Sequence, residues 1–249
     1  MPLRVLRVRA AGGAFRGMGI TLKCREDVEN LIKDITVLGE IPKLKGKELN
    51  TLVQRNDRSL LSESFRIIRT NFDFVRRGRH VQDYDNVIFV TSTINGEGKS
   101  FFSTNMALTL ANLDRRVLLI GADIRNPQTD LGLPNQKKKQ DSKTGLTEYL
   151  SDDTVRVEDA ISTFTVGDNT LDVLLAGKMP PNPAELLMSA RMKPLFDQVS
   201  NTYDYVIVDT APVKMVTDTM LLGHHADLCL YIVRANYLDK RLLDIPAKM

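Results

Sequence analysis

The sequence predicts an α/β fold, a doubly wound and mostly parallel sheet with helices on both faces. Five continuous apolar segments alternate with helix-compatible stretches, and they lie at residues 87–90, 116–122, 171–175, 205–209 and 228–233. A glycine-containing turn, Gly96–Ser100, follows the first of these segments and precedes a helical stretch at 101–113. Two of the segments lead directly into an aspartate, Asp123 and Asp209. Strands that are apolar throughout are typical of a parallel sheet that is covered on both sides.

Length and charge divide the chain into two expected parts. Its 249 residues are 43% hydrophobic, enough for one large domain. We expect residues 1–57 to form a basic arm and linker, and residues 58–249 to form the main domain. The formal net charge is +3, but residues 1–25 carry six basic and no acidic side chains, so the remainder is slightly acidic. Such an arm suits anionic lipid or nucleic acid, or it is a solvated tail or cloning remnant.

The cysteine count and the hydropathy pattern bear on the compartment. No run of about 20 apolar residues occurs, so we expect no membrane-spanning segment in this chain. The N-terminus also lacks a continuous apolar signal core. The chain has two cysteines, Cys24 and Cys229, and Cys229 lies in an apolar run. We expect a reducing compartment, no disulfide framework and a core position for Cys229.

The first third of the chain contains two predicted helices. Residues 25–35 form a short amphipathic pattern with acidic residues in its first turn, and a short apolar segment at 37–42 precedes a polar linker at 43–56. Residues 59–75 have helical periodicity, with Glu63, Arg66 and Arg69 opposite the apolar face. That polar face is either simply solvated or a seam that meets a neighbouring subunit.

The rest of the chain supplies further helices around the later strands. Residues 134–144 are lysine-rich and predict a charged, flexible excursion. Helices are predicted in four further segments, 146–150, 184–189, 191–199 and 217–225.

The turn after residues 87–90 has the composition of a phosphate-binding loop. Gly96 and Gly98 allow backbone N–H groups to turn inward around an anion, and the following helix adds N–H donors and partial positive charge. Lys99 supplies a full charge for terminal phosphates, and the Ser100 hydroxyl suits Mg²⁺. The match to Gly-x4-Gly-Lys-Ser is incomplete, because Thr93 stands at the first glycine position. An ordinary strand-to-helix turn with a surface lysine is the alternative.

The two aspartates belong at the same edge of the predicted sheet as this loop. Ligands of open α/β sheets bind at the carboxyl ends of the strands, where Asp123 and Asp209 stand. Asp209 suits the surroundings of Mg²⁺ beside Ser100, and Asp123 is available to steer the metal or to accept a proton. Each aspartate alone is equally well explained as a turn or cap residue.

Together these motifs resemble those of the bacterial tyrosine kinases (BY-kinases), the cytoplasmic domains of capsule and exopolysaccharide co-polymerases. Residues 87–100, 117–127 and 204–209 are similar to the family's three Walker motifs. Glu63-x-x-Arg66-x-x-Arg69 is similar to its oligomerisation motif, and residues 182–187 are similar to its Asn-Pro-x-Glu-Leu-Leu segment. Residues 25–27 and 38–42 are similar to the segment that follows the family's second transmembrane helix. The resemblance covers about residues 20–237 and implies a P-loop NTPase-like (MinD/ParA-like) fold.

The resemblance also implies an activity, cofactors and roles for residues. It implies an ATP-dependent protein-tyrosine autokinase that uses Mg²⁺, with catalytic roles for Lys99, Asp123, Arg125 and Asp209. ATP phosphates would contact the loop residues, which are Asn95, Gly96, Glu97, Gly98, Lys99, Ser100 and Phe101. Mg²⁺ would contact Ser100, Asp123 and Asp209, and the next subunit would contact Glu63, Arg66 and Arg69.

The implied setting is the cytoplasmic face of the inner membrane. There the resemblance implies ring-like self-assembly with phosphorylation in trans, polysaccharide export machinery and a tyrosine phosphatase as partners, and no nucleic acid. The first 57 residues would then be juxtamembrane-like.

Four departures from the family pattern are visible. Asn95 stands where proline is frequent, Gly121 stands where many members carry an aspartate, and the six tyrosines are scattered instead of clustered in a tail. The family's last helix–strand unit is missing after Met249, so we expect a C-terminally truncated domain. Gly121 and the scattered tyrosines favour an alternative, a catalytically weak, ATP-gated assembly module. A partition or positioning ATPase is a third reading, but it usually carries an early second lysine, and positions 92–95 are Ser-Thr-Ile-Asn.

Overall fold

A computed structural model describes residues 5–10, 21–32, 35–44, 51–77, 86–127, 131, 133–134, 144–214 and 218–243. Within these residues one eight-stranded sheet runs in the order β2-β1-β8-β3-β7-β4-β6-β5. Its strands are β1 (Val5–Ala10), β2 (Val37–Ile41), β3 (Val87–Ser92), β4 (Val117–Gly121), β5 (Ile161–Val166), β6 (Asn169–Leu174), β7 (Tyr205–Asp209) and β8 (Leu228–Arg234). Every neighbouring pair is parallel except the antiparallel pair β5 and β6.

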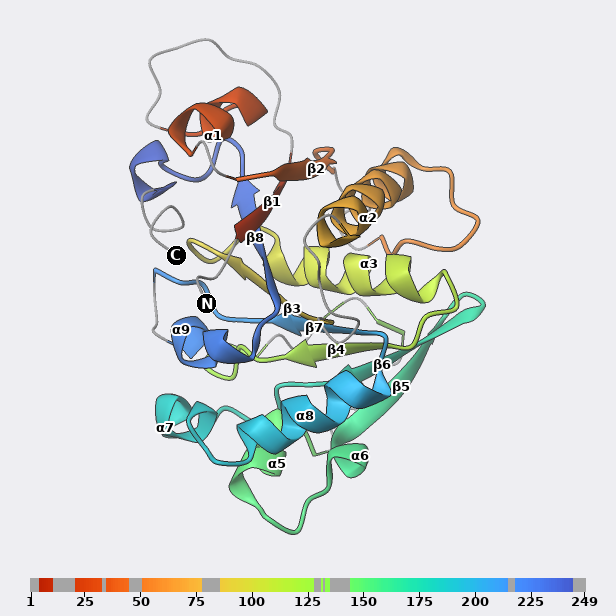
Figure 1. Cartoon of the computed structure of the whole chain (residues 1–249), viewed down its shortest axis with the longest axis vertical. Coiled ribbons are helices and arrows are strands. Elements are labelled where there is room, and N and C mark those ends of the chain that lie inside the picture. The colour runs from red at the N-terminus through yellow and green to blue at the C-terminus, as the bar shows by residue number, and fades with distance from the viewer. Residues whose placement is uncertain are drawn as a thin grey trace.

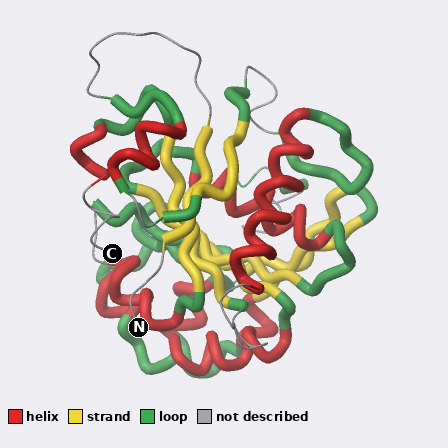
Figure 2. Tube along the Cα trace, turned by 45° about the horizontal axis from the view of Figure 1, so that its top comes forward, coloured by secondary structure: helices red, strands yellow, loops and turns green. Residues whose placement is uncertain are grey.

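Helices cover both faces of the sheet, as Figure 1 shows. The long helices α2 (Leu60–Arg77) and α3 (Lys99–Ala111) cover one face. The other face is covered by five shorter helices, α5 (Leu146–Ser151), α6 (Val157–Ala160), α7 (Pro183–Leu187), α8 (Met192–Thr202) and α9 (Asp218–Leu222). The strands lie between them as a twisted layer (Figure 2). The predicted doubly wound, mostly parallel sheet is confirmed.

The central strand β3 shows why these strands are apolar throughout. Ile88 and Val90 pack into the cluster under α2 and α3, whereas Val87 and Phe89 pack into the cluster under α8. Successive side chains of a strand point to opposite faces, and both faces are buried here, so neither set can be polar. All six residues of β3 are buried.

A third apolar cluster joins the N-terminal region to the chain after β8. It contains Val28 of α1 (Arg25–Leu31), Leu22, Tyr231, Leu238 and, in the 3₁₀ helix η3 (Lys240–Leu243), Leu243. β1 and β2 come from the segment expected to be an arm and linker, and they hydrogen-bond into the main sheet. The division after residue 57 stays a prediction.

The strands β1 and β5, the helix α6 and the 3₁₀ helix η3 were absent from the sequence prediction, and β2 was recognised only as a short apolar segment. In β5 buried residues alternate with residues that are not buried, which is the pattern of an edge strand with one face on the core. Gly167, at φ 59°, makes the turn from β5 to β6. The predicted helix 217–225 divides into α9 and the 3₁₀ helix η2 (Gly223–His225). The lysine-rich segment 137–143 lies outside the described residues.

Candidate active site

The phosphate-loop candidate connects β3 to α3 at the carboxyl edge of the sheet. Gly96 (φ 83°) and Gly98 (φ 93°) both have left-handed backbone conformations, which favour glycine. A Cβ at residue 96 would also lie 2.8 Å from the Tyr237 hydroxyl, whereas residue 98 faces open space. Gly98 is the N-cap of α3, so the helix begins at Lys99 and its first-turn N–H groups have no carbonyl partner within the helix. The conformation therefore provides the amide donors that an anion requires.

The buried Glu97 carboxylate braces this loop from inside. One of its oxygens accepts the backbone N–H groups of Thr93 at 2.7 Å and Ile94 at 2.9 Å. The other accepts the backbone N–H of Arg234 at 3.3 Å. Glu97 is only 1% exposed. Its predicted role at the ATP phosphates is therefore limited to its backbone, because its side chain is committed to holding the loop.

The end of β8 braces the same loop from outside. An Arg234 guanidinium N–H donates to the Gly96 carbonyl at 2.8 Å, and the Tyr237 hydroxyl donates to the Asn95 carbonyl at 3.0 Å. The Arg234 guanidinium also lies over the Tyr237 ring, 5.1 Å from its centroid. Sequence reasoning missed both residues. Their position just after a strand that ends at this edge is the signal that could have found them.

A buried charged cluster lies directly below the loop. The Lys99 ammonium donates to one Asp209 oxygen at 2.7 Å, and the Ser100 hydroxyl donates to the other at 2.5 Å. Ser103, one helical turn beyond Lys99, also donates to Asp209 at 3.2 Å. Asp123 lies close by, with an oxygen 4.0 Å from the Lys99 ammonium. The four residues expected to converge, Lys99, Ser100, Asp123 and Asp209, lie together.

The sheet register explains this convergence. Asp209 ends β7, whose neighbours are β3 and β4, and Gly121 of β4 is its direct partner. The chain then continues to Asp123, whose carboxylate accepts the backbone N–H of Asn126 at 3.2 Å. Parallel strands that end at one edge therefore bring the loop and both aspartates together.

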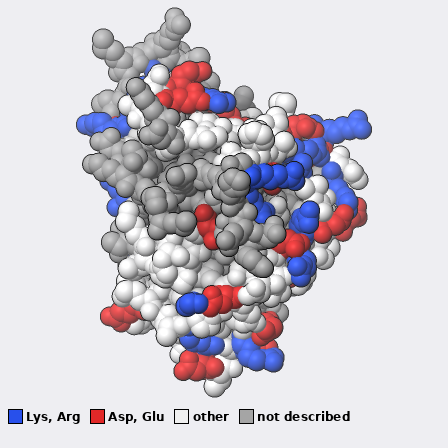
Figure 3. All heavy atoms as spheres, in the orientation of Figure 1, with Lys and Arg blue, Asp and Glu red and all other residues white. Residues whose placement is uncertain are grey.

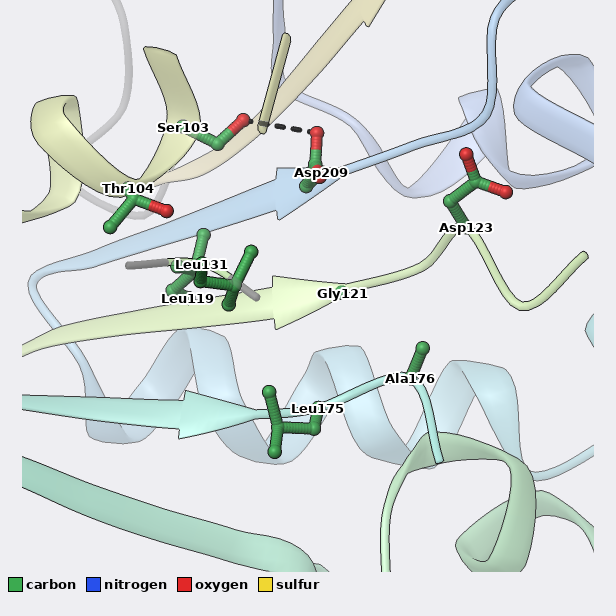
Figure 4. A pocket seen from close by; sticks show the side chains of 9 residues that line it. All are labelled: Ser103, Thr104, Leu119, Gly121, Asp123, Leu131, Leu175, Ala176 and Asp209. Atoms are coloured by element: carbon green, nitrogen blue, oxygen red, sulfur yellow. Dashed lines mark hydrogen bonds between the residues drawn. The ribbon is translucent and has the colours of Figure 1, made fainter. Parts of the chain in front are cut away.

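A cavity of about 10 Å³ lies beside Gly121, between Asp209, Asp123 and the α3 residues Ser103 and Thr104 (Figure 4). This volume is about the minimum that holds one water molecule. The buried Thr104 hydroxyl has no hydrogen-bond partner among the residues that the structure describes. A Cβ at residue 121 would lie 3.2 Å from the Ala176 nitrogen, so a side chain there requires a small shift of the neighbouring chain.

The donor set fits a magnesium–nucleotide complex. Ser100, Asp123 and Asp209 offer only oxygen ligands, which Mg²⁺ prefers. No group of three or more His, Cys, Asp or Glu side chains suited to a metal occurs among the described residues. This composition suits a cation that is held mainly by substrate phosphates and water, with one or two protein oxygens.

Comparisons with known proteins agree with this geometry. A family model described as an AAA domain matches residues 85–239. Tyrosine-protein kinase YwqD of Bacillus subtilis (strain 168) is 36% identical over 193 residues, which cover 77% of this chain and 76% of that protein. The chain belongs to the bacterial tyrosine kinase family.

Other members of the family are also similar to most of this chain. Tyrosine-protein kinase ptk of Acinetobacter johnsonii is 36% identical over 190 residues, covering 76% of this chain but only 24% of that protein. The solved kinase domain of Escherichia coli tyrosine kinase ETK has a TM-score of 0.74 and 26% identity, covering 90% of this chain and 88% of that domain. The chain thus spans most of some tyrosine kinases of the family and about a quarter of others.

The remaining predicted residues occupy more peripheral positions. Arg125 is partly exposed, two residues beyond Asp123, and the Phe101 ring packs against Phe65 with a centroid distance of 6.3 Å. Only the backbone of Phe101 is therefore placed to meet a phosphate. Arg66 pairs with Glu63 and donates to the carbonyls of residues 55 and 57, at 3.1 Å and 2.6 Å.

Proposed function

We propose that this chain is an ATP-dependent protein-tyrosine kinase domain that phosphorylates other copies of itself. The observation that carries the proposal is the cluster of Lys99, Ser100, Asp209 and Asp123 at the end of a glycine loop. It joins a phosphate-binding backbone to a hydroxyl and carboxylates suited to Mg²⁺ and proton transfer. Its tyrosine kinase relatives favour this function over a partition or positioning ATPase.

Each residue of the cluster has a task that its position permits. The amides of the loop and of the first turn of α3 bind the phosphates, and Lys99 neutralises the terminal ones. Ser100 and Asp209 would hold Mg²⁺, which supplies charge neutralisation when it is bound. Asp123 accepts the proton of the attacking tyrosine hydroxyl, and Arg125 neutralises charge on the transferred group. Phosphoryl transfer is therefore mainly positioning and electrostatics.

Nucleotide binding must compete with contacts that the cluster already makes. The Lys99 ammonium is bonded to Asp209, so a triphosphate has to draw it upward toward the loop. The Ser100 hydroxyl can turn an oxygen lone pair to the cation and still donate its hydrogen to Asp209. Withdrawal of Lys99 frees an Asp209 oxygen for the cation, so nucleotide binding and metal loading are coupled.

The outer face of α2 supports a proposal of ring-like self-assembly. Leu60, Ile67 and Phe74 recur every seven residues, and all are more than half exposed. Seven residues are nearly two helical turns, so these side chains form one stripe. Acidic and basic side chains are interspersed along the right-hand side of the face in Figure 3, the side of the molecule on which Figure 1 draws α2.

The biological setting follows from family membership and remains part of the proposal. The assembled kinase would regulate polysaccharide synthesis and export at the cytoplasmic face of the inner membrane, opposed by a tyrosine phosphatase. Among the described residues, no helix is both long and apolar enough to span a bilayer.

Incubation with radiolabelled ATP, Mg²⁺ and a tyrosine-rich peptide tests the function. We expect phosphotyrosine with the unaltered chain and none with Lys99→Met. A folded chain that binds ATP but forms no phosphotyrosine would contradict the kinase proposal and favour the assembly module. Light scattering of the unaltered chain and of Arg69→Glu, each with and without nucleotide, then tests assembly. Arg69 is preferable to Arg66, because Arg66 supports its own chain.

A further inference from the structure

Tyr237 differs from the other tyrosines that the structure describes. It is 44% exposed, whereas Tyr149 and Tyr231 are 3% and 0% exposed. Tyr203 and Tyr205 are partly buried, and each hydroxyl bonds to an aspartate, at 2.9 Å and 3.4 Å. Burial, with that aspartate, raises the pKa of both phenols. Of these five tyrosines, Tyr237 is the most exposed residue and therefore the one most accessible to another protein.

The Tyr237 hydroxyl also lies on the phosphate loop itself. It donates to the Asn95 carbonyl at 3.0 Å, and the Arg234 guanidinium lies over its ring at 5.1 Å. A phosphate is bound by backbone N–H groups, whereas Tyr237 contacts the loop through a carbonyl oxygen. The hydroxyl is therefore bonded on the outside of its own loop. A phosphoryl group is more readily donated to it by a second copy of the chain.

We propose that Tyr237 is an autophosphorylation site, modified in trans, and that its modification loosens the phosphate loop. This inference rests on the proposed tyrosine kinase function. The Tyr237 oxygen attacks the γ-phosphorus of ATP held by the second copy, and a new O–P bond forms. The bond between that phosphorus and the β–γ bridging oxygen breaks, ADP leaves, and the phenolic proton passes to Asp123 of the donor copy.

Phosphorylation removes the outer brace of the loop for two reasons. The ester oxygen of phosphotyrosine carries no hydrogen, so the donation to the Asn95 carbonyl ends. The new phosphate, with a charge of about −1.5 to −2, then competes for the neighbouring Arg234 guanidinium, which now donates to the Gly96 carbonyl. The added negative charge also repels an incoming triphosphate. Modified chains should consequently bind ATP more weakly, which makes the reaction self-limiting.

The test separates the acceptor from the enzyme. A tagged Lys99→Met chain, which cannot transfer phosphate itself, is mixed with the unaltered chain, ATP and Mg²⁺, and its phosphotyrosines are mapped by peptide mass spectrometry. We expect phosphate on Tyr237, with an initial rate that rises with the concentration of the unaltered chain. Adding Tyr237→Phe to the acceptor should abolish this signal, whereas adding Tyr205→Phe as the matched control should leave it unchanged. Circular dichroism of each acceptor establishes that it is folded.

The outcomes distinguish this inference from the proposed function. Phosphate on the tyrosine-rich peptide or on other tyrosines, with none on Tyr237, overturns the inference and leaves the kinase function standing. No phosphotyrosine on any substrate overturns both. Chains that carry phosphate on Tyr237 should bind a fluorescent ATP analogue about tenfold more weakly, as expected for the loss of about two hydrogen bonds that hold the loop. Equal affinity overturns the proposed effect on the loop.

Discussion

Replacing Lys99 by methionine tests whether the buried charged cluster forms as described. The side chains of Lys99 and Asp209 are 8% and 4% exposed, so their ion pair is nearly free of solvent screening. Removing the ammonium leaves the Asp209 carboxylate buried with two hydroxyl donors and no cation, and with the Asp123 carboxylate nearby. Breaking a buried pair in this way costs about 3–5 kcal/mol. Because domains are stable by only about 5–15 kcal/mol, that loss should be conspicuous.

A double-mutant cycle assigns this loss to the pair. Asp209→Asn in the Lys99→Met background removes the stranded charge and keeps nearly the same shape. The double variant should therefore be more stable than Lys99→Met alone, although it has lost both charges of the pair. The chain has no tryptophan, so circular dichroism during urea unfolding is the suitable measurement.

Lys193→Met is the matched control for this experiment. Lys193 and Asp197 form an ion pair on α8 at 2.5 Å, but their side chains are 73% and 60% exposed. An exposed pair of this kind contributes less than about 1 kcal/mol. If Lys99→Met proved no more costly than Lys193→Met, or if the losses from Lys99→Met and Asp209→Asn simply added, the buried pair would not exist in solution.

Three further predictions concern the loop and one half-buried histidine. Glu97→Ala should cost about 2–3 kcal/mol in urea unfolding, because it removes the carboxylate that accepts three backbone N–H groups, those of Thr93, Ile94 and Arg234; a loss below about 0.5 kcal/mol would contradict that brace. Gly96→Ala should weaken ATP binding in a titration, because residue 96 has a positive φ and a Cβ there would contact the Tyr237 hydroxyl. Adding Tyr237→Phe should restore only part of the lost affinity, since the positive φ remains. Unchanged affinity of Gly96→Ala would contradict the predicted backbone strain. Burial lowers the pKa of His225 to about 4 from 6.5, and the neighbouring His224 adds to the effect. The unfolded chain then binds more protons than the folded one, so stability present above pH 6.5 should be lost as the pH falls toward 4. His225→Gln should flatten this dependence in urea unfolding more than His224→Gln, which removes only the smaller contribution to the shift; equal curves for both variants would refute the assignment.

The central part of the fold was predictable because it depends on local patterns. The strands β3, β4, β7 and β8 are nearly continuous apolar runs, β6 overlaps a mostly apolar segment, and the glycine loop has a fixed relation to the helix that follows it. Because those strands end at one edge, the convergence of Lys99 with two aspartates followed from the parallel arrangement alone.

The elements that were missed depend on contacts distant in sequence. β1 pairs with β8 along its whole length, across more than 200 residues of chain, and its basic residues gave it the appearance of a solvated arm. Glu97 was placed at the ATP phosphates because it lies within the loop sequence, and the sequence did not reveal that its buried side chain holds the backbone of its own loop. Arg66 was expected at a subunit interface, and its bonds within the chain could not be deduced from helical periodicity.

The braces of the loop also connect it physically to the segment around α1. Two backbone hydrogen bonds join Leu22 to the chain beyond β8, from the Leu22 N–H to the carbonyl of Leu238 and from the Asn236 N–H to the carbonyl of Leu22. The Lys240 ammonium bonds to Asp27 of α1 at 2.8 Å. Tyr237 lies between these contacts, on the same short stretch that holds the loop. A displacement of residues 21–31 must therefore either break these bonds or move Tyr237 against the loop, which makes this region a physical route from the N-terminal segment to the phosphate site.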